Sequence, residues 1–214
     1  MMRLHRAGIP YLAWTALAAL GSFLFGYPWL SAVFLVLMLG FAAFFRHPER
    51  HSASPPEVVV SPADGRVVAV GECPEWVKSK GLAQSVAIFM SPANVHVNRA
   101  PAAGNVVEAY WRKGKKWPAY RPKASELNEH AFVLLQTAFG PVAYRQIAGA
   151  LARRVVCEVT PGMQLERGQP VGIIKFSSRV ELYLPAHARI LVKVGDRTRA
   201  GETPVASFGE GPQA

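Results

Sequence analysis

The stretch Ile9–Phe45 contains no charged residue and no histidine, and this constrains the fold of the chain more than any other feature. It is nearly twice as long as the ~20 apolar residues that one membrane-spanning helix needs. The sequence Gly26-Tyr27-Pro28 lies near its centre and favours a break in helical structure. A hairpin of two short apolar helices is therefore predicted for residues 1–50.

Cationic residues flank this stretch on both sides, at Arg3 and Arg6 before it and at Arg46 and Arg50 after it. Positive charge on both flanks favours a hairpin whose two ends lie in the cytoplasm. One alternative is a shallow re-entrant hairpin that does not cross the bilayer. Another is a signal peptide cleaved near residues 16–18, which the continuing apolar run disfavours. The prediction is a cell-membrane protein whose remaining domain lies on the cytoplasmic side.

Beyond a Ser/Pro-rich linker at 51–57, the sequence changes to short alternating or apolar runs separated by Gly, Pro and Asp, a pattern that predicts strands. Few windows there carry a helical period. Residues 51–214 are therefore predicted to form one β-rich domain. The expected strands are Val58–Val60, Arg66–Val70, Ser85–Met90, Val106–Trp111, Ala131–Gln136, Arg153–Val159, Val171–Phe176, Arg179–Leu184 and Arg189–Val194.

The C-terminal part holds a weak internal repeat. The segments Val159–Gly168 and Val192–Gly201 share the frame V-x-x-G-x5-G. Each reads as a strand, a glycine turn, a short polar excursion and a second glycine turn, which is similar to the half-barrels of biotinyl-carrier and lipoyl-carrier domains. The fold class predicted is thus mostly β, a carrier-like barrel or sandwich with an internal pseudo-repeat, and the segment between the repeats carries Ser178.

The chain is basic, because it has 24 Lys and Arg against 14 Asp and Glu, a formal net charge of +10. This balance suits a polyanionic partner, and the apolar stretch favours an anionic bilayer surface over nucleic acid. The basic loop 112–123, with its interleaved aromatics, is interpreted as a lipid-phosphate contact, and a merely solvated run of charges is the alternative. Cys73 and Cys157 are far apart in sequence and indicate neither a disulfide framework nor a zinc site.

Three polar residues, Asp64, His96 and Ser178, each lie at the edge of an expected strand. Separately each has an ordinary explanation. Asp64 suits a turn, His96 a hydrogen-bonded strand position facing away from Val95 and Val97, and Ser178 a polar kink. Together they supply a carboxylate, a base and a hydroxyl, which is the set that nucleophilic catalysis requires.

Five blocks of the sequence also recur, in this order, in one known family. They are Phe44–Arg50, Ser61–Gly65, Ser91–Pro101, Gln146–Arg154 and Ile174–Val180. Together they resemble the short-chain bacterial and archaeal branch of the phosphatidylserine decarboxylases, and the resemblance runs from Phe44 to the C-terminus. The apolar N-terminus is also usual for that branch.

The resemblance implies a self-processing pyruvoyl enzyme, a carboxy-lyase that converts phosphatidylserine to phosphatidylethanolamine and CO2. In that family, the serine corresponding to Ser178 attacks the preceding carbonyl, the amide becomes an ester, and elimination splits the chain. The products would be a β chain of 1–177 and an α chain of 178–214 that begins with the pyruvoyl group. The two chains are expected to stay together as a heterodimer, and further oligomerisation is left open.

The chemistry implied is that of a covalent electron sink. The ketone condenses with the substrate amine as a Schiff base and takes up the electrons left when CO2 departs. No metal and no pyridoxal phosphate are implied. His96 is then expected to be the general base of processing, and Asp64 the residue that orients it.

Two positions depart from the family's pattern. Ser177 stands where the family has glycine before the serine, and its Cβ and hydroxyl crowd the attacked carbonyl and offer a competing nucleophile. Arg99 stands where the long-chain branch has a second histidine, and it is interpreted as a substrate-binding residue for a carboxylate or phosphate. His130 is a further candidate for substrate binding.

Two rival functions stay open on the sequence. The same chemistry would act on another serine-headed lipid, such as an archaeal ether lipid (archaetidylserine-like). Alternatively, Ser177 favours an unprocessed, non-catalytic, membrane-tethered adaptor of the lipoyl type.

Overall fold

A computed structural model describes residues 2–115, 117, 127–149, 154–175 and 178–209. The chain divides into two compact units, residues 1–49 and 50–214. The sequence prediction put this boundary one residue later, after residue 50. Arg50 belongs to the second unit because its guanidinium donates hydrogen bonds to the Asp64 carboxylate and to the carbonyl of Ala200.

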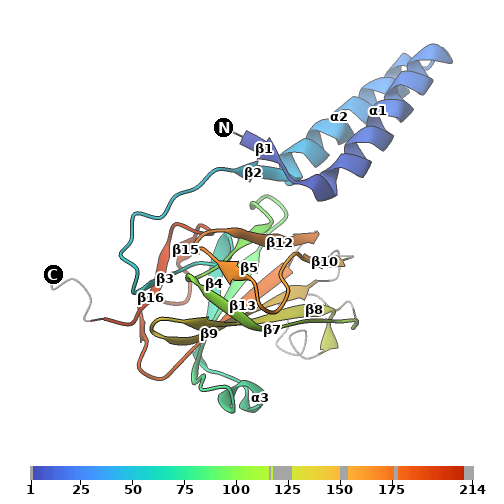
Figure 1. Cartoon of the computed structure of the whole chain (residues 1–214). Coiled ribbons are helices and arrows are strands. Elements are labelled where there is room, and N and C mark those ends of the chain that lie inside the picture. Colours follow the sequence, from blue (N-terminus) through green and yellow to red (C-terminus); the bar gives the residue numbers. More distant parts are fainter. Residues whose placement is uncertain (1, 116, 118–126, 150–153, 176–177, 210–214) are drawn as a thin grey trace. The chain divides into compact units, whose positions relative to one another are not determined.

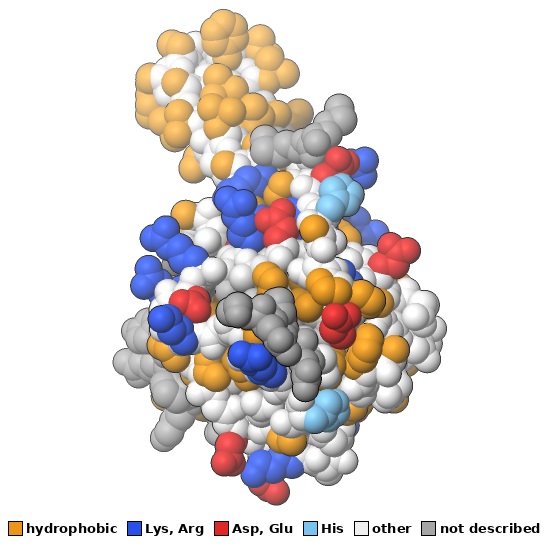
Figure 2. Space-filling view, turned by 90° about the vertical axis from the view of Figure 1, so that its left-hand side faces the viewer, with side chains coloured by type: hydrophobic (Ala, Val, Ile, Leu, Met, Phe, Trp, Pro, Cys, Tyr) orange, Lys and Arg blue, Asp and Glu red, His pale blue; other side chains and the backbone are white. Residues whose placement is uncertain are grey.

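The first unit contains the predicted helical hairpin. Helix α1 (Ile9–Leu24) follows a short 3-10 turn at Arg6–Gly8, and α2 (Pro28–Phe44) follows the break, where Gly26 adopts a φ of 80°. Strands β1 (Met2–Leu4) and β2 (Arg46–Pro48) pair antiparallel at its open end. Arg6–Leu24 is long and apolar enough to cross a membrane, while α2 is shorter. Hydrophobic side chains cover the hairpin surface seen in Figure 2.

The second unit is built from strands, as predicted (Figure 1). Its main sheet has eight strands in the order β11-β7-β8-β9-β13-β5-β4-β15, and two three-stranded sheets, β10-β12-β6 and β14-β16-β3, accompany it. The elements are β3 (Val58–Val60), β4 (Gly65–Glu72), α3 (Glu75–Lys78), β5 (Gln84–Met90), β6 (Val97–Arg99), β7 (Gly104–Arg112), β8 (His130–Thr137), β9 (Gly140–Ala148), β10 (Arg154–Cys157), β11 (Gln164–Leu165), β12 (Pro170–Lys175), β13 (Ser178–Leu184), β14 (Arg189–Ile190), β15 (Arg197–Thr198) and β16 (Pro204–Ser207).

The internal repeat has a structural counterpart. Gly162 and Gly195 both have positive φ, 87° and 100°, and so do Gly168 and Gly201, with 80° and 78°. Glycine is the residue that adopts such angles without strain, which explains the shared frame. After the first glycine of each unit comes a two-residue strand: β11 pairs with β7 at one end of the main sheet, and β15 pairs with β4 at the other.

A second pair of segments extends this pseudo-symmetry. Ser61–Gly65 leads into β4 and Ala100–Gly104 leads into β7, and both read x-Pro-Ala-x-Gly. Each is held by one repeat unit, since the backbone N–H of Gly201 donates to the carbonyl of Ser61 and that of Gly168 donates to the carbonyl of Ala100. The internal repeat is therefore present in the hydrogen bonds as well as in the sequence.

Strand β9 is absent from the sequence prediction, although it is a neighbour of β13 in the middle of the main sheet. The sequence of β9 does not alternate between polar and apolar residues, because both faces of the strand are buried. Every residue from Val142 to Ala148 is buried, and the polar Arg145 and Gln146 lie among them. The predicted strand position of His96 is also wrong. His96 precedes β6, and it is buried together with both neighbouring valines rather than on a face opposite to them.

The main sheet buries side chains on both faces. On the inner face, Val180, Tyr144, Ile88 and Val133 belong to the large hydrophobic core. On the outer face a smaller core forms where Phe132 and Tyr183 pack against residues of the α3 segment, including Val77. Ser178 has the same strand parity as Val180 and therefore points inward, whereas Arg179 and Glu181 point outward.

The tight entry into β4 gives a stability prediction. A Cβ on Gly65 would lie 2.1 Å from the carbonyl oxygen of Phe89, whereas a Cβ on Gly71 in the same strand would meet no atom within 4 Å. We expect Gly65→Ala to destabilise the chain by about 2 kcal/mol and to lower its Tm by roughly 4–8 °C. Gly71→Ala is the matched control and should leave Tm unchanged or higher. Equal effects of the two substitutions on thermal unfolding would contradict this packing.

Candidate active site

Ser178 is the first residue of β13, and the backbone pairs it with Met90 of β5 on one side and Ala148 of β9 on the other. Its side chain is fully buried, and its Oγ donates to the Met90 sulfur at 3.2 Å. A thioether is a weak acceptor, so it holds the hydroxyl without taking its proton. The preceding residues 176 and 177, which include the departure at Ser177, lie outside the described residues.

His96 lies beside the strand that leads to Ser178. Its backbone carbonyl accepts from the N–H of Ile174 at 3.4 Å, near the end of β12, two residues before the undescribed step to Ser178. Its Nδ1 is 2.9 Å from the carbonyl oxygen of Asn94. A carbonyl only accepts hydrogen bonds, so Nδ1 carries a proton, and in the neutral ring Nε2 is the basic nitrogen. This is the tautomer that a general base needs.

A buried amide pair, which was not among the residues predicted for the site, adjoins these residues. Asn98 donates through Nδ2 to the Met90 sulfur at 3.6 Å, and its Oδ1 accepts from Gln146 Nε2 at 2.8 Å. Both side chains are fully buried, and Gln146 Oε1 has no hydrogen-bond partner among the described residues. The signal available in the sequence was their position inside two of the five family-like blocks, Ser91–Pro101 and Gln146–Arg154. Ser178 and Asn98 therefore converge on one sulfur atom.

Asp64 lies at the start of β4, as expected, but it does not hydrogen-bond His96. Its carboxylate accepts from the Arg50 guanidinium, with Nη2 at 2.9 Å from Oδ2, and from the backbone N–H of Ala200 at 2.8 Å. Both charged side chains are nearly buried, so this is an internal ion pair. The predicted orienting contact is thus corrected: the carbonyl of Asn94, rather than a carboxylate, occupies the His96 Nδ1 side.

Arg99 extends this charge cluster. It is buried, and its Nη1 donates to the carbonyl of Gly168 at 2.7 Å. Burial lowers the pKa of Arg99, the nearby Arg50 charge lowers it further, and Asp64 and Glu202 act in the opposite direction. Its guanidinium therefore belongs to a buried group that ties β6 to the two glycine turns.

His130, the other candidate substrate-binding residue, occupies the opposite face of the main sheet from Ser178. It pairs with Ile147, which pairs with Arg179, and paired residues share a face. Its Nδ1 is 2.8 Å from the carbonyl of Asn128, and burial lowers its pKa. The structure therefore places His96 beside β12, the strand that precedes Ser178 in the chain, and puts His130 on the opposite face of the main sheet from Ser178. Most of the basic loop 112–123 lies outside the described residues.

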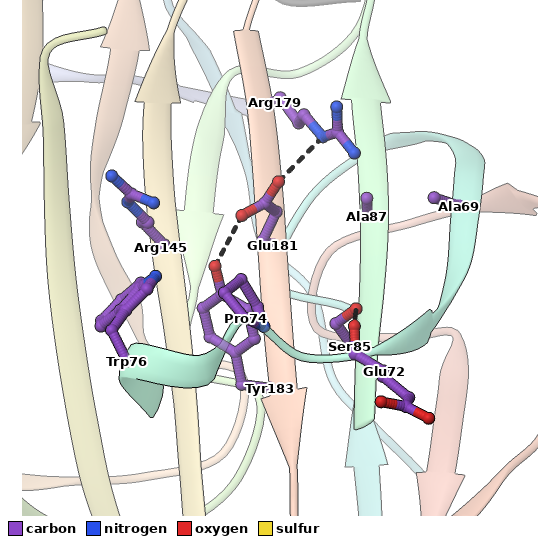
Figure 3. A pocket seen from close by; sticks show the side chains of 10 residues that line it. All are labelled: Ala69, Glu72, Pro74, Trp76, Ser85, Ala87, Arg145, Arg179, Glu181 and Tyr183. Atoms are coloured by element: carbon purple, nitrogen blue, oxygen red, sulfur yellow. Dashed lines mark hydrogen bonds and ion pairs between the residues drawn. The ribbon is translucent and has the colours of Figure 1, made fainter. Parts of the chain in front are cut away.

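A cavity of about 350 Å³ lies on that outer face, next to Arg179. Figure 3 shows the side chains that line it. Glu181 accepts there from the Tyr183 hydroxyl at 2.6 Å and pairs with Arg179 Nε at 3.2 Å. Burial, followed by the Glu181 charge, raises the pKa of Tyr183, so its hydroxyl keeps its proton. No cluster of three or more His, Cys, Asp or Glu suited to a metal ion occurs among the residues that the structure describes.

Comparison with known proteins gives one consistent result. The profile of the phosphatidylserine decarboxylase family matches residues 37–206. A phosphatidylserine decarboxylase proenzyme of Magnetococcus marinus is 42% identical over 92% of this chain and 92% of its own length. Proenzymes of the same name from Desulfotalea psychrophila (39% identical, covering 92% of this chain and 93% of the relative) and Trichlorobacter lovleyi (45%, covering 84% and 81%) are also similar.

The ion pair between Asp64 and Arg50 leads to a prediction about the stability of the chain. Asp64→Asn removes the hydrogen-bonded counter-charge of the buried Arg50 guanidinium and leaves only Glu202, at 4.0 Å, so we expect a loss of about 3 kcal/mol in the free energy of unfolding. Asp196→Asn is the control, since Asp196 caps a turn through Lys193 N–H and is in no ion pair among the described residues. Urea unfolding of the two variants distinguishes a carboxylate that stabilises the fold through a buried ion pair from one that only caps a turn. An Asp64→Asn chain as stable as wild type would mean that the carboxylate does not hold the fold.

Proposed function

The chain belongs to the phosphatidylserine decarboxylase family, and from this membership we propose that it converts phosphatidylserine to phosphatidylethanolamine and CO2. The single observation that carries the proposal is the family match over residues 37–206. The arrangement of Ser178 and His96 supports it, because Ser178 has a buried hydroxyl at the start of β13, and His96, with a basic Nε2, lies beside β12, the strand that precedes Ser178 in the chain. The name proenzyme, printed for the relatives, favours self-processing.

We propose that processing begins at Ser178. Its Oγ attacks the carbonyl carbon of Ser177, His96 takes the hydroxyl proton, and that proton passes to the departing amide nitrogen of residue 178, so the amide becomes an ester. Removal of the α-proton of residue 178 then expels the Ser177 carboxylate and cuts the chain. The resulting dehydroalanine takes up water and loses ammonia, which leaves a pyruvoyl group at the start of the 178–214 chain.

The residues around Ser178 fit such a group. They are small or uncharged, namely Ala148, Met90, Asn98 and Gln146, and they leave a buried amide oxygen with no described partner. When in place, the group supplies a covalent ketone that accepts the electrons released with CO2. The protein's own part is to exclude water, to hold the new N-terminus through the pairing of β13, and to offer the Asn98 and Gln146 amides as hydrogen-bond partners.

The fold also supports two chains that remain together after cleavage. Residues 178–209 supply β13, which pairs on both sides with strands of the larger chain, and β15 and β16, which pair with β4 and β3. Breaking one peptide bond before β13 leaves all these pairings in place. The cleaved protein is therefore proposed to be a heterodimer of its α and β parts.

Membrane attachment follows from the first unit. Its apolar helices expose large hydrophobic side chains such as Trp14, Leu24 and Trp29. We propose that they anchor the chain in the cell membrane with the β domain on the cytoplasmic side, where its positive charge favours anionic lipid.

Intact-mass spectrometry of the denatured chain tests the processing proposal. Wild type is expected as two fragments divided before Ser178, whereas Ser178→Ala and His96→Ala should persist as one chain of 23.3 kDa, because the first lacks the nucleophile and the second lacks the base. The histidine control is His187→Ala, at an exposed loop position bonded to the Phe139 carbonyl. Division before Ser177 would instead identify Ser177 as the nucleophile. An uncut wild type whose Ser177→Gly variant is cut would identify a blocked precursor.

The amide pair has its own test. If the Asn98 amide stabilises the oxyanion formed on the Ser177 carbonyl, Asn98→Leu should slow cleavage of freshly refolded precursor by roughly 10²-fold. Asn105→Leu, at an exposed position of β7, is the matched control. A cleavage time course identical in the two variants would remove Asn98 from the reaction.

A further inference from the structure

The outer face of the main sheet carries a second group of polar residues that the processing chemistry does not use. One row of directly paired residues crosses five strands, running from Tyr110 through Phe132, Arg145 and Glu181 to Ala87. The neighbouring row contains Arg112, His130 and Arg179. These side chains face away from Ser178, because Ser178 alternates with Arg179 along β13.

Arg145 is the unusual member of this group. It is only 5% exposed, and its Nε has no hydrogen-bond partner among the described residues. Its guanidinium lies over the Trp76 ring, 5.2 Å from the centroid, and makes no ion pair in the described part of the chain. In Figure 3 the dashed lines join Glu181 to Arg179 and to Tyr183, while Arg145 lies apart, beside Trp76. Glu181 lies opposite Arg145 on β13, but its carboxylate is engaged by Arg179 and Tyr183. A buried guanidinium with no ion pair of its own is costly, so a further anionic partner would stabilise it.

A pocket of about 440 Å³ opens beside Arg145, next to the cavity of Figure 3. Its cations are Arg145, Arg112 and Lys80, and its one carboxylate, Glu108, is already paired with Lys80. Arg112 lies over the Tyr110 ring at 5.1 Å and, like Arg145, has no ion-pair partner among the described residues. The pocket thus presents two guanidinium groups, each oriented by an aromatic ring.

His130 also lines this pocket, and the pocket's positive charges affect its pKa. Burial lowers the pKa of His130, and the positive charges of Arg145 and Arg112 lower it further. The imidazole is therefore neutral at pH 7. It adds polar surface without adding to the repulsion between the two guanidinium groups.

We propose that this pocket is a binding site for a phosphate group, held by Arg145 and Arg112. Guanidinium forks match the tetrahedral oxygens of phosphate, and the net charge of the lining, three cations against one carboxylate, suits a phosphate monoanion or dianion. The volume accommodates a small phosphate ester rather than a polymer. A lipid headgroup and free phosphate share this chemistry. The site lies across the sheet from Ser178 and does not depend on the processing proposal.

Isothermal titration of the full chain in detergent tests this site with two probes, inorganic phosphate and glycerophosphoserine. Wild type should bind at least one of them, and Arg112→Gln and Arg145→Gln should each weaken that binding roughly tenfold or more. Arg66→Gln is the matched control, because Arg66 is an exposed arginine of the same sheet outside the pocket lining. Arg112 is exposed, so its variant keeps the test valid if the buried Arg145→Gln chain fails to fold.

The two probes separate the sources of phosphate. Tighter binding of glycerophosphoserine supports a headgroup site, and tighter binding of inorganic phosphate supports a site for the free ion. The proposal is overturned if neither probe binds wild type at millimolar concentration, or if Arg112→Gln and Arg66→Gln bind the probe as wild type does. Because the readout is equilibrium binding, it is independent of whether the chain is cut before Ser178.

Discussion

The pairing of β13 along both of its edges is the constraint on which the rest of the structure depends. From Ser178 onward the strand is bonded to β5 on one side and to β9 on the other. Side chains alternate between faces, so a slip of one residue would turn Ser178 out of the core and bring Arg179 into it. Double pairing in the middle of a sheet excludes such a slip, because two ladders and both hydrophobic faces would have to shift together. The register of one strand thus decides which chemistry faces inward.

Much of this fold was predictable because its constraints are local. The apolar stretch 9–45 and its central Gly-Tyr-Pro predicted the hairpin, and the repeated glycines predicted the turns that hold β11 and β15. Strand β9 was missed for the opposite reason. Both of its faces are buried, and its polar residues, Arg145 and Gln146, are accommodated by tertiary contacts that periodicity does not reveal.

For the candidate site, the sequence located the residues better than it located their partners. Asp64 and His96 directly precede β4 and β6, and Ser178 begins β13, because polar residues next to turn signals mark strand ends. The assumed Asp64–His96 contact was wrong, since Arg50 and the Ala200 N–H take the carboxylate. These partners are far apart in the sequence, and they meet only because the turn at Ala200–Gly201 folds back against Asp64 and Arg50. The roles of Ser178, His96, Asp64, Arg99 and His130 in chemistry remain predictions.

Buried arginines in the β domain are compensated in different ways, and this contrast links the site to the further inference. The Arg50–Asp64 and Arg179–Glu181 pairs each join opposite charges, so neither member is left uncompensated in a low dielectric. Arg145 is as buried as these residues, yet it has an aromatic ring where they have a carboxylate. A ring orients a guanidinium but does not neutralise it. Glu181, the residue opposite Arg145 on β13, is already engaged by Arg179 and Tyr183. An anion that enters the pocket shared with Arg112 would give Arg145 a counter-charge of its own.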